Sequence, residues 1–253
     1  MNRTDEPPDA SAIPVATATT ATTATMRLPA FFDQVPKLMV RDPMAELLGC
    51  AEGGLFEYGY ADAVRLTGHS CPTVAMAYWL TVRSLRVLYP GELPVRGGIE
   101  VQFRDSARSG EVGVVATVVQ MLTGAAGSSG FKGLWGRFSR AGLLRIAPDL
   151  PMSLRFRRLD TGAAVDAAAD LSLVPADPEL QRLIERNARE PLDSAEMAVL
   201  GQLWQRRVRH LLLEAGEDPA VFMVRPALRN GKALPGVGGA LVRRERRVPI
   251  VVR

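Results

Sequence analysis

Two residues with metal-ligand chemistry, separated by a single residue, stand in the segment T-G-H-S-C-P at 67–72. The imidazole of His69 and the thiolate of Cys71 are of the types that zinc and its neighbours prefer in proteins. Pro72 suits the first position of a helix, which places Cys71 at a helix N-terminus, where free N–H groups favour a thiolate. The residue types and their setting make His69 and Cys71 a candidate metal half-site, with zinc as the default ion.

The same pair admits two other interpretations. Cys71 can be a small packed side chain and His69 a helix-capping residue, and spacing alone favours this reading because a lone H-x-C pair is a weak signal. A nucleophilic Cys71 activated by His69 is the third interpretation. For a metal site, carboxylates, water or a second subunit must complete the ligand set. Cys50 is expected to be a packed thiol at the end of a short helix, and His210 a solvated side chain.

A second candidate site follows a run of apolar residues at 112–121. Thr123 and Gly124 open a glycine-rich loop that leads to Lys132. Backbone N–H groups of such a loop, together with a lysine, can hold a small anionic ligand. Thr123, Gly124 and Lys132 therefore carry the alternative function, a non-enzymatic ligand-binding or assembly module.

Both segments resemble motifs of the FmdE-like family, which takes its name from one of the subunits of formylmethanofuran dehydrogenase. The T-G-H-S-C-P segment at 67–72 is similar to that family's H-G-H-x-C-P-G signature, and Q-M-L-T-G at 120–124, with the loop up to Lys132, is similar to its Q-x-L-T-G-C-T-x-G-K-G segment. The order and separation of the two motifs agree, and together they span roughly residues 45–150. The chain has Thr67, Thr73 and Ala125 where the family has His, Gly and Cys.

The resemblance implies an α+β fold, a possible homodimer and zinc bound through the His and Cys of the first motif, here His69 and Cys71. It also implies a link to one-carbon or molybdopterin enzymes. Whether the protein is itself an enzyme is left open, because the sequence contains no recognisable carboxylate pair, triad or nucleotide fingerprint.

Hydrophobic patterning predicts a mostly antiparallel sheet packed against a buried central helix. The helix is expected over 72–88, because its first half is apolar on all sides. Strands are expected at 99–103, at 112–121 as the central strand, at 142–146 and at 152–156, and alternation predicts an extended segment over 55–66.

The C-terminal third is expected to be helical. One helix is predicted at 177–187 and another from a capping box at 193–196 to about residue 215. Residues 1–27, rich in Ala, Thr and Pro, are expected to be a disordered leader, and 226–253 a basic Gly/Arg-rich tail. These assignments leave residues 28–225 as the α+β domain.

The chain of 253 residues carries a formal net charge of +4. The basic residues are scattered outside one cluster at 243–247, and no nucleic-acid-binding motif accompanies that cluster, so no nucleic-acid partner is expected. Apolar runs are shorter than the roughly 18 residues of a membrane span, and no membrane partner is expected either. Two cysteines are too few for a disulfide framework, which favours a cytoplasmic location.

Overall fold

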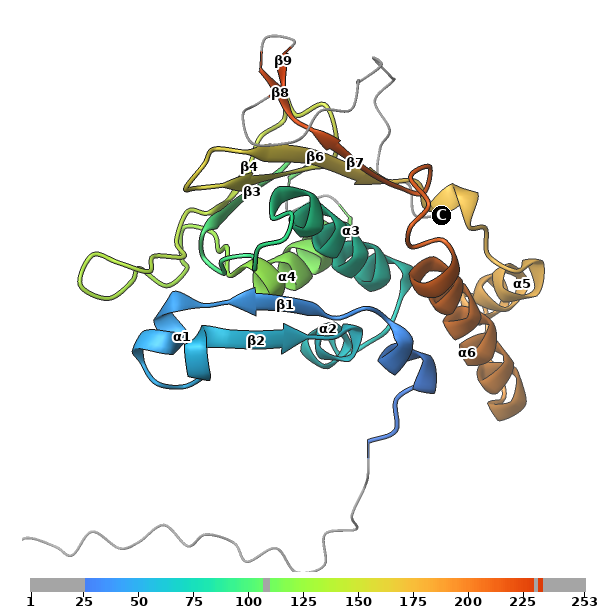
Figure 1. Ribbon diagram of the computed structural model, residues 1–253. Helices are drawn as coiled ribbons and strands as arrows, with labels where there is room; N and C mark the ends of the chain where they lie inside the picture. Colours follow the sequence, from blue (N-terminus) through green and yellow to red (C-terminus); the bar gives the residue numbers. More distant parts are fainter. Residues whose placement is uncertain (1–25, 107–109, 230–231, 234–253) are drawn as a thin grey trace, which may run out of the picture.

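The computed structural model describes residues 26–106, 110–229 and 232–233, and this part of the chain has an α+β fold in three layers (Figure 1). A five-stranded sheet is the upper layer in that view. The middle layer holds α3 (Pro72–Leu88) and α4 (Val112–Thr123), and the lower layer holds β1 (Leu38–Arg41), β2 (Leu55–Tyr58) and α2 (Tyr60–Thr67). The predicted fold class is confirmed. None of the helices within the described ranges is long and apolar enough to cross a membrane.

The central helix α3 lies between the sheet and the lower layer. Every side chain from Pro72 to Val82 is buried, whereas Arg83 is half-buried and Arg86 is exposed. Full burial of one valine, leucine or methionine side chain stabilises a fold by about 1.5–3 kcal/mol. The predicted helix is confirmed with its bounds, and its N-terminal end is where the candidate metal ligands lie.

The sheet has the strand order β4-β3-β5-β6-β7. Only the β3–β4 pair is parallel; the other three pairs are antiparallel, as predicted. The strands are β3 (Ile99–Phe103), β4 (Leu144–Ile146), β5 (Leu154–Arg158), β6 (Ala164–Ala169) and β7 (Phe222–Pro226). Sequence analysis did not predict β6, whose four alanines carry little strand signal, or β7, which ends at Pro226, where the tail was expected to begin.

The predicted central strand at 112–121 is wrong, because these residues form the helix α4. Its buried side chains recur every three or four residues, at Val112, Val115, Val119 and Leu122 among others. Gly124, in the left-handed conformation with φ of 73°, ends the helix. Packing of this apolar stripe against α2 and α3 outweighs the strand preference of the valines.

The extended segment expected over 55–66 is right only for its first four residues, which form β2 and pair with β1 in antiparallel fashion. From Tyr60 onward the chain is helical, and the buried residues Tyr60, Ala63 and Val64 share one face of α2. The carboxylate of Asp62 accepts the amide hydrogen of Gly59 at 2.8 Å, which stabilises the start of the helix.

The short helix α1 (Pro43–Leu47) has Asp42 as its N-cap, as predicted. Its end differs from the prediction: the helix stops at Leu47, and Cys50 lies exposed in the turn that follows. The expectation of a packed Cys50 thiol is therefore wrong, because the side chain falls beyond the helix rather than on its apolar face.

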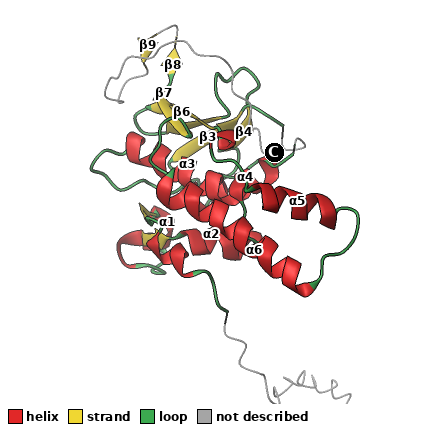
Figure 2. Cartoon of the chain, turned by 90° about the vertical axis from the view of Figure 1, so that its right-hand side faces the viewer, coloured by secondary structure: helices red, strands yellow, loops and turns green. Residues whose placement is uncertain are grey.

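The helical C-terminal third is confirmed. The helices α5 (Pro178–Asn187) and α6 (Ser194–Arg209) form a hairpin at one side of the molecule, and the predicted capping box opens α6 (Figures 1 and 2). A single π-helical turn, His210–Glu214, continues α6 and ends with the amide of Ala215 on the carbonyl of His210 at 2.9 Å. His210 is exposed, as expected.

The remaining elements are short. They are the 3-10 turns η1 (Ala30–Gln34), η2 (Glu52–Gly54) and η3 (Leu171–Leu173), and the strand pair β8 (Leu228–Arg229) and β9 (Lys232–Ala233). Of the predicted leader, residues 1–25 lie outside the described residues, as do 230–231 and 234–253 of the predicted tail. The strand β7 runs through Pro226 and pairs with β6, across the predicted start of the tail.

Candidate metal centre

The turn between α2 and α3 positions both predicted metal ligands. Gly68 ends α2 in the left-handed conformation, with φ of 76°, and its amide binds the carbonyl of Val64 at 2.8 Å. Pro72 is the first residue of α3, and Cys71 is its N-cap, with Sγ accepting the amide hydrogen of Val74 at 3.4 Å. The thiol thus lies half-buried at the helix N-terminus, as the sequence predicted.

His69 lies exposed on this turn, and its ring is held by its own segment. Its Nδ1 is 3.0 Å from the carbonyl oxygen of Thr67. A carbonyl oxygen only accepts, so Nδ1 must carry the hydrogen, and the lone pair of a neutral ring is then on Nε2. Histidine ligands of metals in proteins are commonly oriented in this way, with Nδ1–H donated to a carbonyl and Nε2 free to bind.

Ser70, between the two candidate ligands, is held by the helix α6. The indole Nε1 of Trp204 donates to the Ser70 carbonyl at 2.9 Å, and Nε2 of Gln205 donates to the same oxygen at 3.3 Å. The Ser70 hydroxyl donates to Oε1 of Gln205 at 3.0 Å. Sequence analysis identified neither Gln205 nor Trp204 as part of this site, because about 135 positions separate them from Ser70.

Tyr60 supports the same turn from α2. Its hydroxyl is 2.9 Å from the Ser70 hydroxyl, and because Ser70 donates its hydrogen to Gln205, the tyrosine must be the donor. Burial raises the pKa of the Tyr60 phenol, so it keeps the hydrogen that this bond requires. The turn that carries His69 and Cys71 is therefore fixed from two sides.

The described residues provide two candidate donor atoms at this site, Nε2 of His69 and Sγ of Cys71. Among the described residues, His, Cys, Asp and Glu nowhere form a group of three or more able to hold a metal ion. Cys50 is exposed elsewhere, and His210 lies with Nδ1 3.4 Å from Oε2 of Glu214 on the continuation of α6. Two donor atoms do not make a closed structural zinc site, which needs four protein ligands.

The second candidate site lies at the other end of α4. The N-terminal end of α4 lies near the start of α3: burial raises the pKa of Glu111, and the nearby Thr73 side chain offsets part of that rise. The C-terminal end lies beside Gly97, whose amide binds the Thr123 carbonyl at 2.7 Å. Twelve helical residues span about 18 Å, so the fold separates the two candidate sites instead of bringing them together.

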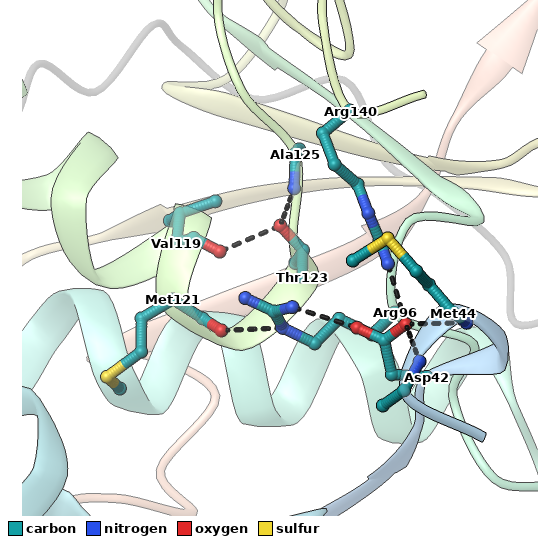
Figure 3. Close-up of polar contacts among 9 residues, drawn as sticks. Asp42, Met44, Arg96, Val119, Met121, Thr123, Ala125 and Arg140 are labelled. Atoms are coloured by element: carbon teal, nitrogen blue, oxygen red, sulfur yellow. Dashed lines mark hydrogen bonds and ion pairs between the residues drawn. The ribbon is translucent and has the colours of Figure 1, made fainter. Parts of the chain in front are cut away.

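The polar groups of Thr123 and Gly124 are used within the chain (Figure 3). The Thr123 hydroxyl donates to the carbonyl of Val119 at 2.7 Å and accepts the amide hydrogen of Ala125 at 3.1 Å. The Gly124 amide binds the carbonyl of Gln120. Both residues are buried, whereas the third predicted anion ligand, Lys132, is exposed.

A buried ion cluster lies beside Gly124. Asp42, only 2% exposed, accepts from Nη1 of Arg96 at 2.9 Å and from Nη2 of Arg140 at 2.7 Å (Figure 3). Burial alone would raise the pKa of the Asp42 carboxyl, but the two guanidinium groups and the Met44 amide hold that pKa below its ordinary value. Sequence analysis recognised Asp42 as a helix cap and missed this second role.

No protein-family model matches the chain, and no curated protein matches it.

Proposed function

We propose that this protein binds one divalent transition metal ion, zinc by default, through Nε2 of His69 and Sγ of Cys71. The observation that carries the proposal is the hydrogen bond from Nδ1 of His69 to the Thr67 carbonyl. It leaves Nε2 as the free lone pair on an exposed ring, two residues from a thiol that caps a helix N-terminus. Water, a carboxylate or a small ligand occupies the remaining positions.

The same proposal includes membership of the FmdE-like family of formylmethanofuran dehydrogenase components, as a cytoplasmic homodimer with a link to one-carbon metabolism. The motifs at 67–72 and 120–132 support the family assignment. In a homodimer, the carboxylate among the remaining ligands can come from the second copy of the chain. The alternative module, an anion held by Thr123, Gly124 and Lys132, has less support, because the hydroxyl and the glycine amide are already bonded internally.

Metal analysis of protein purified without added metal and without an affinity-tag histidine run tests the proposal. We expect about one equivalent of metal in the wild type and none in Cys71→Ser, because the thiolate is a direct ligand. His69→Ala should lower the affinity by more than the 10–100-fold typical of a group that only orients a ligand. Acidification should release the metal, because protons compete for both donor atoms.

Two matched variants serve as controls. Cys50→Ser removes an exposed thiol, and His210→Ala removes an exposed imidazole, so neither should change the metal content. Equal metal content in Cys71→Ser and the wild type, or no metal in either, would leave the packed thiol and capping histidine as the correct interpretation.

A further inference from the structure

A protruding arm, residues 127–142, follows α4 and extends beyond the layers as the yellow-green loop at the left edge of Figure 1. Backbone bonds close it at its base, from the Gly142 amide to the Gly127 carbonyl at 3.0 Å and from the Arg140 amide to the Phe131 carbonyl at 2.8 Å. The guanidinium of Arg140 is bound to buried Asp42. The arm is thus attached to the core through its C-terminal limb.

The tip of the arm is a two-residue hairpin turn with an unusual occupant. Leu134 and Arg137 exchange both backbone hydrogen bonds, at 2.9 and 2.8 Å, and the two residues between them have positive φ, 49° at Trp135 and 74° at Gly136. Such turns favour Asn-Gly, because asparagine tolerates the left-handed region far better than a bulky aromatic residue. Trp135 is therefore strained where it stands.

The strained side chain is also fully presented to solvent. Trp135 is 79% exposed and Phe131, on the same arm, is 43% exposed. Folding gains nothing from a large aromatic ring in this position, and strain that folding does not require is a reason to look for function. The ring offers a large apolar surface with one N–H donor, a combination suited to an interface that is apolar on one side and wet on the other.

The charges around the tip all have one sign. Residues 112–148 contain no Asp or Glu and four basic residues, Lys132, Arg137, Arg140 and Arg145. Arg140 is bound to Asp42, and Arg145, in β4, lies 3.7 Å from Glu100. Lys132 and Arg137 are exposed on the arm itself, and the Arg137 guanidinium lies over the Phe138 ring, 4.7 Å from its centre. The surface that receives this arm should therefore be anionic.

We propose that the Trp135 arm attaches the protein reversibly to the surface of a membrane that contains anionic phospholipid. Trp135 enters the headgroup region while Lys132 and Arg137 stay among the phosphates. A bilayer surface accepts a convex tip with a single leading aromatic ring, whereas a protein partner needs a pocket shaped for it. The expectation of no membrane partner concerned spanning segments, and attachment of this kind needs none.

Cosedimentation of the full-length protein with lipid vesicles tests the proposal. Vesicles of phosphatidylserine and phosphatidylcholine should bind the wild type, and vesicles of phosphatidylcholine alone should not. Each basic residue near an anionic surface contributes about fivefold to the partition coefficient, so Lys132→Gln with Arg137→Gln should weaken binding about 25-fold. Added salt should weaken binding as well.

Trp135→Asn is the most informative variant, because it suits the turn and removes the ring. We expect binding to fall roughly tenfold or more while the melting temperature stays the same or rises. Quenching of tryptophan fluorescence by brominated lipid should occur in the wild type and be absent in this variant. Met197→Ala, which removes another exposed apolar side chain far from the arm, is the control and should bind as the wild type does.

Two results would overturn the proposal. One is that the wild type fails to sediment with the phosphatidylserine vesicles. An acidic protein would then be the better candidate for the partner of the arm. The other is Trp135→Asn protein that binds these vesicles as well as the wild type does, which would assign attachment to another basic segment such as 243–247.

Discussion

The two ends of the α3–α4 helix pair each carry a loop whose sequence looks like a binding site, and the fold treats the two differently. In the turn at 67–72, the polar bonds hold the backbone and the Ser70 hydroxyl and leave Nε2 of His69 without a partner. In the loop after α4, the Thr123 hydroxyl and the Gly124 amide, the groups expected to bind the ligand, are themselves hydrogen-bonded within the chain. A residue of the right type is available for a ligand only when something else holds its loop in place.

The largest expected effect concerns the support of the second loop. Asp42→Ala leaves the guanidinium groups of Arg96 and Arg140 without their carboxylate, and breaking a buried ion cluster costs about 3–5 kcal/mol. Urea unfolding measures this loss. The control is Glu57→Ala, which breaks the exposed pair with Lys37 and should cost less than about 1 kcal/mol. Equal losses in the two variants would show that the cluster is not a stabilising element.

The next effect concerns the support of the first loop. Gln205→Leu keeps the size of the side chain and removes its two bonds to Ser70, so the proposed metal affinity should fall about 10–100-fold with little change in fold stability. A competition titration with a zinc chelator measures the affinity. The matched control is Gln202→Leu, one helical turn earlier and exposed, which should bind as the wild type does. Unchanged affinity in Gln205→Leu would mean that α6 does not position the ligands.

A smaller effect is the difference in stability loss when each of two glycines of the second loop is replaced by alanine. Gly124→Ala must hold alanine at φ of 73° and brings its Cβ to 2.7 Å from Nη1 of Arg140, so we expect a loss of about 1–3 kcal/mol. Gly127→Ala meets no atom within 4 Å and should change stability by less than about 1 kcal/mol. Thermal melts of the two variants compare them directly. A Gly127→Ala loss as large as that of Gly124→Ala would contradict this explanation.

The smallest effect at ordinary pH is the titration of the ion cluster. The folded-state pKa of Asp42 is lowered, so its stabilisation is present above the unfolded value of about 3.9 and is lost as the pH falls through the folded value. The difference in unfolding free energy between the wild type and Asp42→Asn should therefore be constant from pH 7 to about pH 5 and shrink below about pH 4. A difference that changes between pH 7 and pH 5 would assign the titration to another group.

The sequence predicted α3 correctly and α4 incorrectly, and the reason lies in the two sequences. The bounds of α3 were predictable, because Pro72 fixes its start and its 17 residues are more than a strand usually holds. The shorter run of valines in α4 fits a buried strand equally well, and only packing decides between the two. Only one residue, Ser70, separates the candidate ligands in sequence, whereas their supports, Tyr60 and Gln205, meet Ser70 only in the folded chain.

The π turn at His210–Glu214 adds one residue to a helical turn, and this changes the direction in which the residues after it point. Before it, Trp204 and Gln205 face the Ser70 turn; after it, Gly216 fits against Trp79, where an added Cβ would lie 1.9 Å from the indole nitrogen, and its carbonyl accepts from Arg83 at 2.8 Å. A regular α-helix would rotate one of these contacts by about 100° relative to the other. The one extra residue lets α6 contact the Ser70 turn while Gly216, just beyond the helix, packs on Trp79 of α3. Deleting Leu213 should therefore preserve one of these contacts and break the other.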